Sequence, residues 1–454
     1  MAASRKSRPA DPPGALRACL GRHPIDGLRV CVALSGGVDS VVLLHALQRH
    51  CRPGSTDLSA CHVDHGLSPD AGRWVEFCRT LCARLGVPLT IRPVRVERDG
   101  EGLEAAARHA RMAALAAQPA DVVVLAHHAD DQAETVLYRL FRGAGLRGAG
   151  AMREFEGRDG APSLLRPMLA LSRAEIEAWA RREGLAWVED ASNRSADFDR
   201  NYIRHELIAG IRRRFPAATE RLAAAAEQFR EGDALLDRLA AIDWLRLGGG
   251  EVAASCARLA EIDGAGLCNL LRWRIHRLGH RSPARPRLRE AARQLVEVPS
   301  ERPLRIALGE TELCRYRCEF WLQPALAAAP AESPWHGETP VDWAGGAIQF
   351  SHRIGIGLSP RALGGRLTIS VRRDGDRLRT RGGGPLRDFK SLAQQTGVPP
   401  WIRTRLPVLR VDGAPCWAAE LGIEASAACA ADELGLVPRW QAPAGVLTRL
   451  RVVP

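Results

Sequence analysis

Short apolar runs alternate with longer amphipathic stretches over the first 210 residues of the chain. The runs predict β-strands and the stretches predict helices: strands at 30–34, 58–63, 88–96 and 121–126, and helices at 38–50, 73–85, 103–118, 131–141 and 172–183. The run at 121–126 is too uniformly apolar to have a solvent-exposed face, which is typical of a parallel strand covered on both sides. This alternation predicts an α/β fold with a doubly wound parallel sheet.

The pattern changes after about residue 215. A long helix is expected at 217–247, followed by helices at 266–278 and 286–296 and a hairpin at 304–322, and the last part has short strands at 347–350, 367–371, 408–411 and 417–420. Residues 326–340 are rich in Ala and Pro, which is typical of a linker. We therefore predict an α/β domain over 1–215, a mainly helical domain over 216–325, a linker over 326–340 and a small α+β domain over 341–454.

Composition narrows the class of protein. Of 454 residues, 46% are hydrophobic and 26% are charged, as in ordinary globular proteins. No apolar run is long enough for a membrane span, and the basic, Pro-rich residues 1–13 do not form a secretion signal, so we expect a cytoplasmic protein with reduced cysteines. The formal net charge of +12, almost all from arginine, favours a polyanionic partner such as nucleic acid.

The strongest local signal is the segment 35–40, Ser-Gly-Gly-Val-Asp-Ser, between a buried strand and a helix. Its glycines permit a sharp turn, and successive N–H groups at a helix N-terminus bind phosphate. Asp39 beside a phosphate requires a cation between them, so we expect it to bind Mg²⁺. The spacing fits neither a Walker A loop nor a dinucleotide-binding glycine motif.

This segment resembles the PP-loop of the N-type ATP pyrophosphatase superfamily, which has an adenine nucleotide alpha hydrolase-like fold. Further strings resemble the tRNA(Ile)-lysidine synthase family in the same order: Cys-His-Val-Asp-His-Gly-Leu at 61–67, His-His-Ala-Asp-Asp-Gln-Ala-Glu-Thr at 127–135, Arg-Gly-Ala-Gly-Leu at 142–146, Asp-Ala-Ser-Asn at 190–193, Arg-Asn-Tyr-Ile-Arg at 200–204, Arg-Arg-Asp-Gly-Asp at 372–376 and Pro-Pro-Trp-Ile-Arg at 399–403. The resemblance is specific in the N-terminal part and weaker, but continuous, beyond it.

The resemblance implies a carbon–nitrogen ligase that modifies tRNA. ATP would adenylate the C2 oxygen of the wobble cytidine in a tRNA(Ile) with a CAU anticodon, and the ε-amino group of free L-lysine would then attack C2. The products would be lysidine, AMP and pyrophosphate, and the change would alter both the codon read and the amino acid charged. ATP and Mg²⁺ are the implied cosubstrate and cofactor, no membrane is involved, and a homodimer is compatible with the family.

The resemblance and the local chemistry together select candidate residues. For the nucleotide we expect Ser35, Gly36, Gly37, Val38, Asp39, Ser40, His65 and His128. Asp131 and Glu134 lie three apart on one helix face, where they either bind the substrate lysine or form a capping box. Arg204 either stabilises charge on the phosphate or closes the domain by a salt bridge. Asp39, Asp131 and Arg204 are the expected catalytic residues.

Neighbouring residues leave alternatives open. His127 and His128 are general bases, metal ligands or packing residues, and Asp130 is either a loop cap or a second metal ligand. His62, Asp64 and His65 either border the adenine and ribose or form a turn around Asp64. No residue identifies itself as the base for the lysine amine.

Arg108 and Arg111 occupy an Arg-x-x-Arg string in an Ala-rich helix. The family usually has Tyr directly after this string, where this chain has Met112, so the resemblance gives no support for aromatic stacking there. The two arginines either form a solvated helix face or contact phosphate or tRNA.

The segment 366–410 holds ten Arg and one Lys against three Asp, a net charge of +8. Its basic residues are interleaved with Phe389 and Trp401, which is typical of RNA binding by backbone contacts and stacking. For the tRNA we expect Arg372, Arg373, Lys390 and Arg403. The alternative is a solvated basic surface.

Three other functions compete with this interpretation. A PP-loop tRNA thiolase commonly has paired catalytic cysteines, but this chain has no Cys-x-x-Cys. A glutamine-dependent synthetase needs a glutaminase domain, for which we find no candidate. A non-catalytic RNA-binding protein would be expected to have lost Asp39 or the glycines.

Overall fold

The computed structural model describes residues 11–51, 56–66, 68–96, 103–189, 199–299 and 301–448. The motif at 190–193 therefore lies outside the described residues. The chain divides into two compact units, Met1–Ala234 and Leu235–Pro454. The predicted four-part division, with its boundaries at 215, 325 and 340, stays a prediction.

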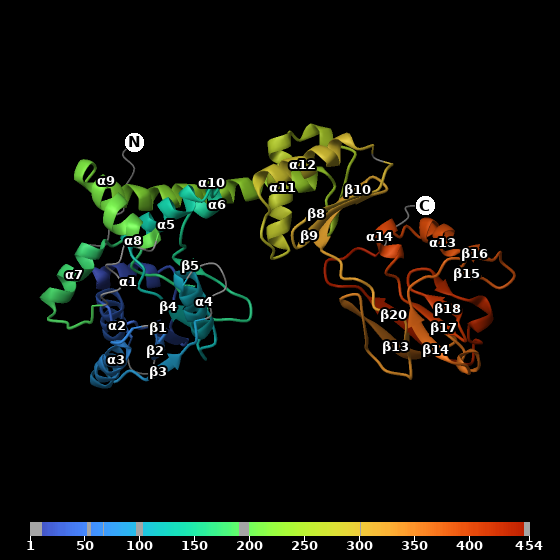
Figure 1. Cartoon of the computed structure of the whole chain (residues 1–454), viewed down its shortest axis with the longest axis horizontal. Coiled ribbons are helices and arrows are strands. Elements are labelled where there is room, and N and C mark those ends of the chain that lie inside the picture. Colours follow the sequence, from blue (N-terminus) through green and yellow to red (C-terminus); the bar gives the residue numbers. More distant parts are fainter. Residues whose placement is uncertain are drawn as a thin grey trace. The chain divides into compact units, whose positions relative to one another are not determined.

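A six-stranded sheet forms the centre of the first unit, in the order β3-β2-β1-β4-β6-β5 (Figure 1). Its strands are β1 (Arg29–Ala33), β2 (Asp57–Asp64), β3 (Leu89–Pro93), β4 (Val122–Val124), β5 (Phe155–Glu156) and β6 (Ser163–Leu165). All neighbouring pairs are parallel except β5 and β6. Because β1 pairs with both β2 and β4, strand order reverses beside β1. In open α/β sheets such a reversal opens a ligand-binding crevice at the carboxyl ends of the strands.

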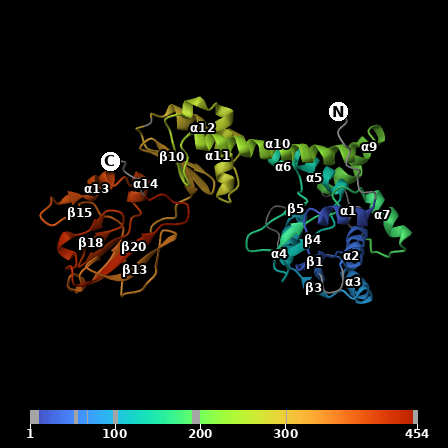
Figure 2. The same cartoon turned by 180° about the vertical axis from the view of Figure 1, so that it is seen from behind.

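Helices cover both faces of this sheet, which confirms the predicted doubly wound fold (Figure 1 and, from behind, Figure 2). Val30 and Val32 of β1 share a core cluster with α1 (Pro12–Leu20), α2 (Val38–His50), α3 (Ala71–Leu85) and α7 (Arg173–Arg182). Cys31, between these valines, belongs to the opposite cluster with Leu115 of α4 (Leu103–Ala116). All three residues of β4 are buried, as its apolar sequence predicted.

A further group of helices follows the sheet in the first unit: α5 (Ala129–Phe141), α6 (Leu146–Ala149), α8 (Asp199–Tyr202), a π-helix (Ile203–Ile208) and α9 (Ala209–Arg214). Ala133 of α5 packs against Ile203 and Ile208 of the π-helix. This contact holds the π-helix against the first turns of α5. The long helix α10 (Ala218–Arg246) then crosses the boundary between the two units.

The second unit begins with helices on an antiparallel sheet of order β7-β10-β9-β8. These elements are β7 (Ala253–Ser255), the 3₁₀ turn Leu259–Glu261, α11 (Gly264–Arg277), α12 (Arg285–Glu297), β8 (Leu304–Leu308), β9 (Thr311–Tyr316) and β10 (Glu319–Pro324). The hairpin expected at 304–322 is thus three strands of a four-stranded sheet. Leu271 of α11 and Ala291 of α12 share its core with Phe320.

The last part of the chain is α+β, as predicted. A five-stranded sheet contains β11 (Ser333–Pro334), β14 (Leu367–Ser370), β17 (Val408–Val411), β18 (Ala414–Ala418) and β19 (Gly422–Ile423), and a three-stranded sheet contains β12 (Val341–Trp343), β13 (Gly346–Ile354) and β20 (Leu434–Gln441). β15 (Arg377–Leu378) pairs with β16 (Arg387–Asp388), followed by α13 (Phe389–Gln395) and α14 (Pro400–Arg403). In the segment 326–340, β11 pairs with β14, and Trp335 is buried.

The expectation that Phe389 and Trp401 stack on RNA bases is wrong. Phe389 is 4% exposed and Trp401 is 7% exposed, and both belong to the core of the second unit. The Trp401 ring lies 5.8 Å from that of Trp321, measured between centroids. Burial of a large aromatic side chain stabilises the fold by several kcal/mol, and a side chain buried in this way cannot stack on RNA.

No helix in the described ranges is both long enough and apolar enough to cross a membrane.

Candidate active site

The PP-loop segment lies between β1 and α2, at the carboxyl end of the strand where the strand order reverses. Gly36 has a φ of +87°, and a Cβ at this position would lie 2.9 Å from Val188 Cγ2. Both the backbone conformation and the close approach therefore require glycine. The sequence prediction of a sharp glycine turn is confirmed.

Hydroxyl groups hold this loop in shape. The Ser35 N–H donates to Ser40 Oγ at 3.2 Å, and Ser40 Oγ donates to the Gly37 carbonyl at 3.0 Å. Ser40 is buried, so its hydroxyl connects the two ends of the loop. The first N–H groups of α2, at Val38 to Ser40, have no partners within the helix and are available to an anion.

Asp39 stands in the first turn of α2. Its Oδ1 atom is buried and has no hydrogen-bond partner within the described residues. Burial is the largest influence on its carboxyl group and raises the pKa of Asp39, although His128 and Arg173 oppose the shift. A buried carboxylate oxygen without a partner fits a bound cation.

His128 lies among three carboxylates at the point where β4 leads into α5. Its ring nitrogens are 3.4 Å from Asp131 Oδ2, 3.6 Å from Asp130 Oδ2 and 3.7 Å from Asp39 Oδ1. Burial disfavours the charged ring, but the three carboxylates together raise the pKa of His128 to about 9. His128 is therefore an imidazolium at neutral pH, and it joins the PP-loop electrostatically to the start of α5.

Asp131 caps α5, but in a different register from the predicted box. The His128 N–H donates to Asp131 Oδ2 at 3.0 Å, so the cap begins at His128 and ends at Asp131. The expected box from Asp131 to Glu134 is wrong, because Glu134 lies beyond the first turn. Asp131 takes part in the cap as the third residue of the helix and not as the predicted N-cap residue, and its Oδ1 atom faces Arg204.

Glu134 and Arg204 form a bidentate ion pair. Arg204 Nε lies 2.6 Å from Glu134 Oε1, and Nη2 lies 2.9 Å from Oε2 and 3.3 Å from Asp131 Oδ1. Glu134 is 4% exposed, and burial raises its pKa despite the guanidinium beside it. The packing of the π-helix on α5 thus brings Arg204 to Asp131 and Glu134, which are three of the four residues expected to bind lysine or to catalyse.

Asp130 is engaged in structure rather than free to bind a metal. Its Oδ2 accepts a hydrogen bond from the Arg173 N–H at 2.8 Å, at the start of α7, and it forms an ion pair with Arg212. The loop-capping alternative is therefore the one observed. No motif identified Arg173 or Arg212 in the sequence, because their partner is 43 and 82 residues away.

The residues at the carboxyl end of β2 divide between the two alternatives. The buried His62 ring contacts the Leu34 carbonyl at 2.9 Å beneath the PP-loop, and Asp64 accepts a turn-forming hydrogen bond from the Gly66 N–H at 2.9 Å. The turn around Asp64 is confirmed. His65 is half-buried, and its Nδ1 atom has no partner within the described ranges, so its predicted nucleotide contact stays a prediction.

His127 differs from its neighbour in charge. Its buried Nδ1 atom has no partner among the described residues. Burial lowers the pKa of His127 to about 3, and the nearby Arg166, Arg111 and Arg108 add to the shift, against Asp131. The ring is therefore neutral at physiological pH, and a group with so low a pKa is a weak general base, which favours the packing alternative.

This shift predicts a pH dependence of stability. Below the unfolded-state pKa of about 6.5 the unfolded chain binds a proton that the folded protein excludes until about pH 3. The free energy of unfolding contributed by this site should fall by about 1.6 kcal/mol between pH 6.5 and 5. Urea unfolding of wild type and His127→Asn at both pH values measures it: the difference between the proteins should shift in favour of the variant at pH 5. An equal loss in both proteins would contradict the assignment.

The four residues expected to contact tRNA lie in different surroundings. Lys390 is exposed on α13, and Arg372 is half-buried. Arg373 is exposed and forms an ion pair with Glu332. Arg403 donates to the Val398 carbonyl at 2.9 Å and to the Tyr316 hydroxyl at 3.0 Å, which gives it a structural role. Their contacts with tRNA stay predictions.

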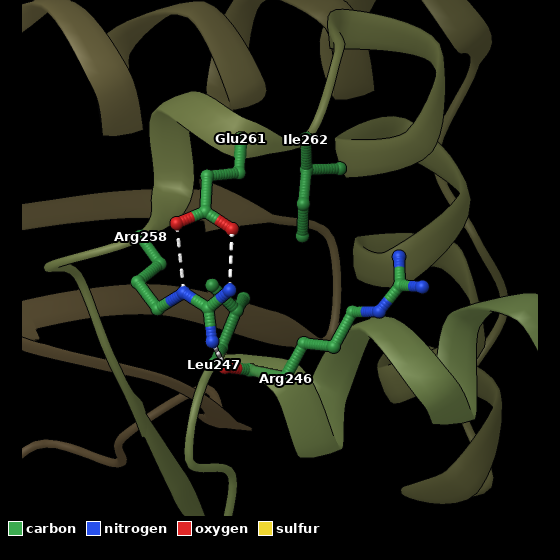
Figure 3. A pocket seen from close by; sticks show the side chains of 5 residues that line it. All are labelled: Arg246, Leu247, Arg258, Glu261 and Ile262. Atoms are coloured by element: carbon green, nitrogen blue, oxygen red, sulfur yellow. Dashed lines mark hydrogen bonds and ion pairs between the residues drawn. The ribbon is translucent and has the colours of Figure 1, made fainter.

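A pocket of about 240 Å³ lies at the end of α10 in the second unit (Figure 3). Its lining residues are Arg246, Leu247, Arg258, Glu261 and Ile262. The Arg258 guanidinium is neutralised by Glu261 through two contacts of 2.7 Å. The pocket contains none of the predicted site residues, so the candidate active site is the cluster around Asp39 and Glu134.

Three family models match the chain. A PP-loop domain matches residues 19–211, a TilS substrate binding domain matches 255–321 and a TilS substrate C-terminal domain matches 367–440.

Curated relatives match almost the whole chain. The tRNA(Ile)-lysidine synthase of Azoarcus sp. (strain BH72) is 46% identical over 414 residues, which is 91% of each protein. That of Aromatoleum aromaticum is 44% identical over 91% of this chain and 97% of the relative, and that of Nitrosomonas europaea is 35% identical over 91% and 92%.

Proposed function

Because this chain belongs to the tRNA(Ile)-lysidine synthase family, we propose that it uses ATP to ligate free L-lysine to C2 of the wobble cytidine in a tRNA(Ile) with a CAU anticodon. The products are lysidine in the tRNA, AMP and pyrophosphate. The competing thiolase and glutamine-dependent functions have no support in these relatives. A cytoplasmic location and a homodimer stay predictions.

One observation supports the proposed lysine site: the carboxylates of Asp131 and Glu134 already bind a cationic group, the guanidinium of Arg204. The Arg204 guanidinium lies on Glu134 and Asp131, close to Asp39 of the PP-loop through His128. The buried Glu134 carboxylate and the half-buried Asp131 carboxylate together favour a cation at this position. In our proposal an ammonium group of lysine replaces the guanidinium.

The PP-loop performs the first half-reaction. Its N–H groups and the start of α2 bind the phosphates, and the cytidine C2 oxygen attacks the α-phosphorus. A bond forms between the C2 oxygen and the α-phosphorus. The bond from the α-phosphorus to the oxygen that bridges to the β-phosphate breaks, and pyrophosphate leaves. Once lysine has taken the carboxylates, Arg204 is free to stabilise charge on the transferred phosphate.

Lysine performs the second half-reaction. Its neutral ε-amino nitrogen attacks C2, the bond from C2 to the adenylated oxygen breaks, and AMP leaves. The ammonium proton must be lost before the attack. Asp131 and Glu134 orient the lysine in this step.

Asp39 would hold Mg²⁺. Its buried Oδ1 atom, which has no hydrogen-bond partner within the described residues and lies 3.7 Å from the His128 ring, would supply one ligand. Within the described part of the chain no three His, Cys, Asp or Glu side chains form a metal site of their own. Mg²⁺ commonly takes one or two carboxylates and completes its shell with phosphate oxygens and water, which fits this position. When bound, the ion neutralises phosphate charge.

The test is incorporation of radiolabelled lysine into purified CAU-anticodon tRNA(Ile), with ATP and Mg²⁺. We expect stable label that requires ATP, with none in a transcript whose wobble cytidine is replaced. Pyrophosphate release that requires tRNA, without label, would retain adenylation and refute lysine as the nucleophile. The absence of both signals from folded protein would refute the proposed function.

A further inference from the structure

A second charged cluster lies in the first unit, and none of the steps above uses it. It consists of Arg108 and Arg111 on α4, Arg139 on α5, Arg166 directly after β6 and Arg200 on α8. We call it the arginine cluster. The carboxyl ends of β4 and β6 supply His127 and Arg166, so the cluster lies at the same sheet edge as the PP-loop, which follows β1.

Backbone carbonyls hold two of these arginines in place. Arg139 Nη1 donates to the carbonyls of Gly148 and Ala151, both at 3.0 Å, and Arg166 Nη1 donates to that of Arg153 at 2.8 Å. Carbonyls orient a guanidinium but do not neutralise it. Of these two arginines, Arg166 also has a carboxylate contact, with Glu156 at 3.2 Å, and Glu156 pairs with Arg158 as well.

Arg108 and Arg111 lack even such partners. Within the described residues neither guanidinium has a hydrogen bond or an ion pair, although both side chains are half-buried. The Nε atoms of Arg111 and Arg166 are fully buried and unpartnered. Burial, followed by repulsion from Arg200, Arg111, Arg139 and Arg166, lowers the pKa of Arg108 to about 10. The solvated helix face considered from sequence is therefore wrong for this pair.

Half-buried guanidinium groups that repel one another and have no carboxylate partner destabilise a ligand-free protein. A bound anion would neutralise these charges and stabilise the arrangement. Guanidinium forks match the oxygens of a phosphate, which they bind by paired hydrogen bonds.

We propose that the arginine cluster is a phosphate-binding site, and that Arg108 and Arg111 bind backbone phosphates of the tRNA beside the nucleotide that reacts. The proposal rests on the proposed function, because it assumes an RNA substrate at this edge of the sheet. ATP is the less suitable source of phosphate, since the PP-loop after β1 supplies its own N–H groups.

The test compares Arg108→Gln/Arg111→Gln with a control of equal charge change, Arg79→Gln/Arg84→Gln, on the exposed side of α3. Fluorescence anisotropy measures the Kd for CAU-anticodon tRNA without ATP, at several salt concentrations. We expect Kd to rise at least about tenfold in the cluster variant, with the slope of log Kd against log salt reduced by about 1.4, for two phosphates of a single strand. The control should change neither by more than about twofold.

Further measurements separate the alternatives. Binding of labelled ATP should be unchanged, and Arg108→Lys/Arg111→Lys should keep most of the salt dependence because it keeps the charge. The Tm of the ligand-free glutamine variant should rise, since unpaired positive charge is removed, so weaker tRNA binding cannot be ascribed to unfolding. An unchanged tRNA Kd would overturn the proposal, as would weaker ATP binding with unchanged tRNA binding. If the variant lost affinity for tRNA but the wild type incorporated no lysine, the phosphate-binding site would be supported and the proposed lysine ligation would be refuted.

Discussion

Asp39→Asn is expected to reduce tRNA-dependent pyrophosphate release by a factor of about 10³. Asparagine has the same shape, but it removes the charge of the buried Oδ1 atom, the proposed Mg²⁺ ligand. Loss of a single preorganised group that stabilises charge in the transition state typically costs a factor of about 10² to 10³. Because Asp39→Asn should also lose the bound Mg²⁺, we expect the rate to fall by the upper value of this range.

The measurement is single-turnover pyrophosphate release at saturating ATP and tRNA. Asp70→Asn is a matched control, because Asp70 is exposed at the start of α3. Release by Asp39→Asn at more than a tenth of the wild-type rate, at saturating Mg²⁺, would show that Asp39 does not hold the ion.

Glu134→Gln should act on the second half-reaction. The substitution keeps the volume of a buried side chain and removes its charge, leaving Asp131 as the remaining carboxylate beside Arg204. Charge-assisted hydrogen bonds contribute about 1.5 to 3 kcal/mol each. We therefore expect the KM for lysine to rise by a factor of about 10², while pyrophosphate release at saturating lysine stays within a few-fold of wild type.

Initial rates of lysine incorporation across lysine concentrations test this split, with pyrophosphate release followed in the same samples. Glu76→Gln, on the exposed face of α3, is the control. If KM for lysine were unchanged, Glu134 would be a structural partner of Arg204 and not part of the lysine site.

Local patterns predicted much of the first unit. The glycine turn at Gly36 follows from residues adjacent in sequence, and the buried β4 follows from its uniformly apolar run. The helix α7 begins after Ser172 as its capping sequence indicates. Such features depend on interactions within a few residues, which a single sequence displays.

Long-range partners could not be predicted in the same way. Arg204 pairs with Glu134, which lies 70 residues before it in the sequence. Arg204 belongs to a π-helix, which the pattern of hydrophobic residues does not predict. The N-cap of α5 lies at His128, three residues before the predicted Asp131. This position could not be predicted, because histidine is not a common N-cap residue. The burial of Trp401 and Phe389 could not be predicted, because an aromatic residue in a basic segment has the same sequence context whether it contacts RNA or packs in a core.

The position of Arg204 has a consequence for the synthesis of the protein. A ribosome completes the PP-loop and the carboxylates of α5 well before it reaches the π-helix, 70 residues after Glu134. At about 5 to 20 residues per second, the nascent chain carries Glu134 without its guanidinium partner for roughly 4 to 14 s. During that interval a buried negative charge opposes closure of the site. The proposed lysine site is thus completed late in the synthesis of the first unit, after the sheet that supports it.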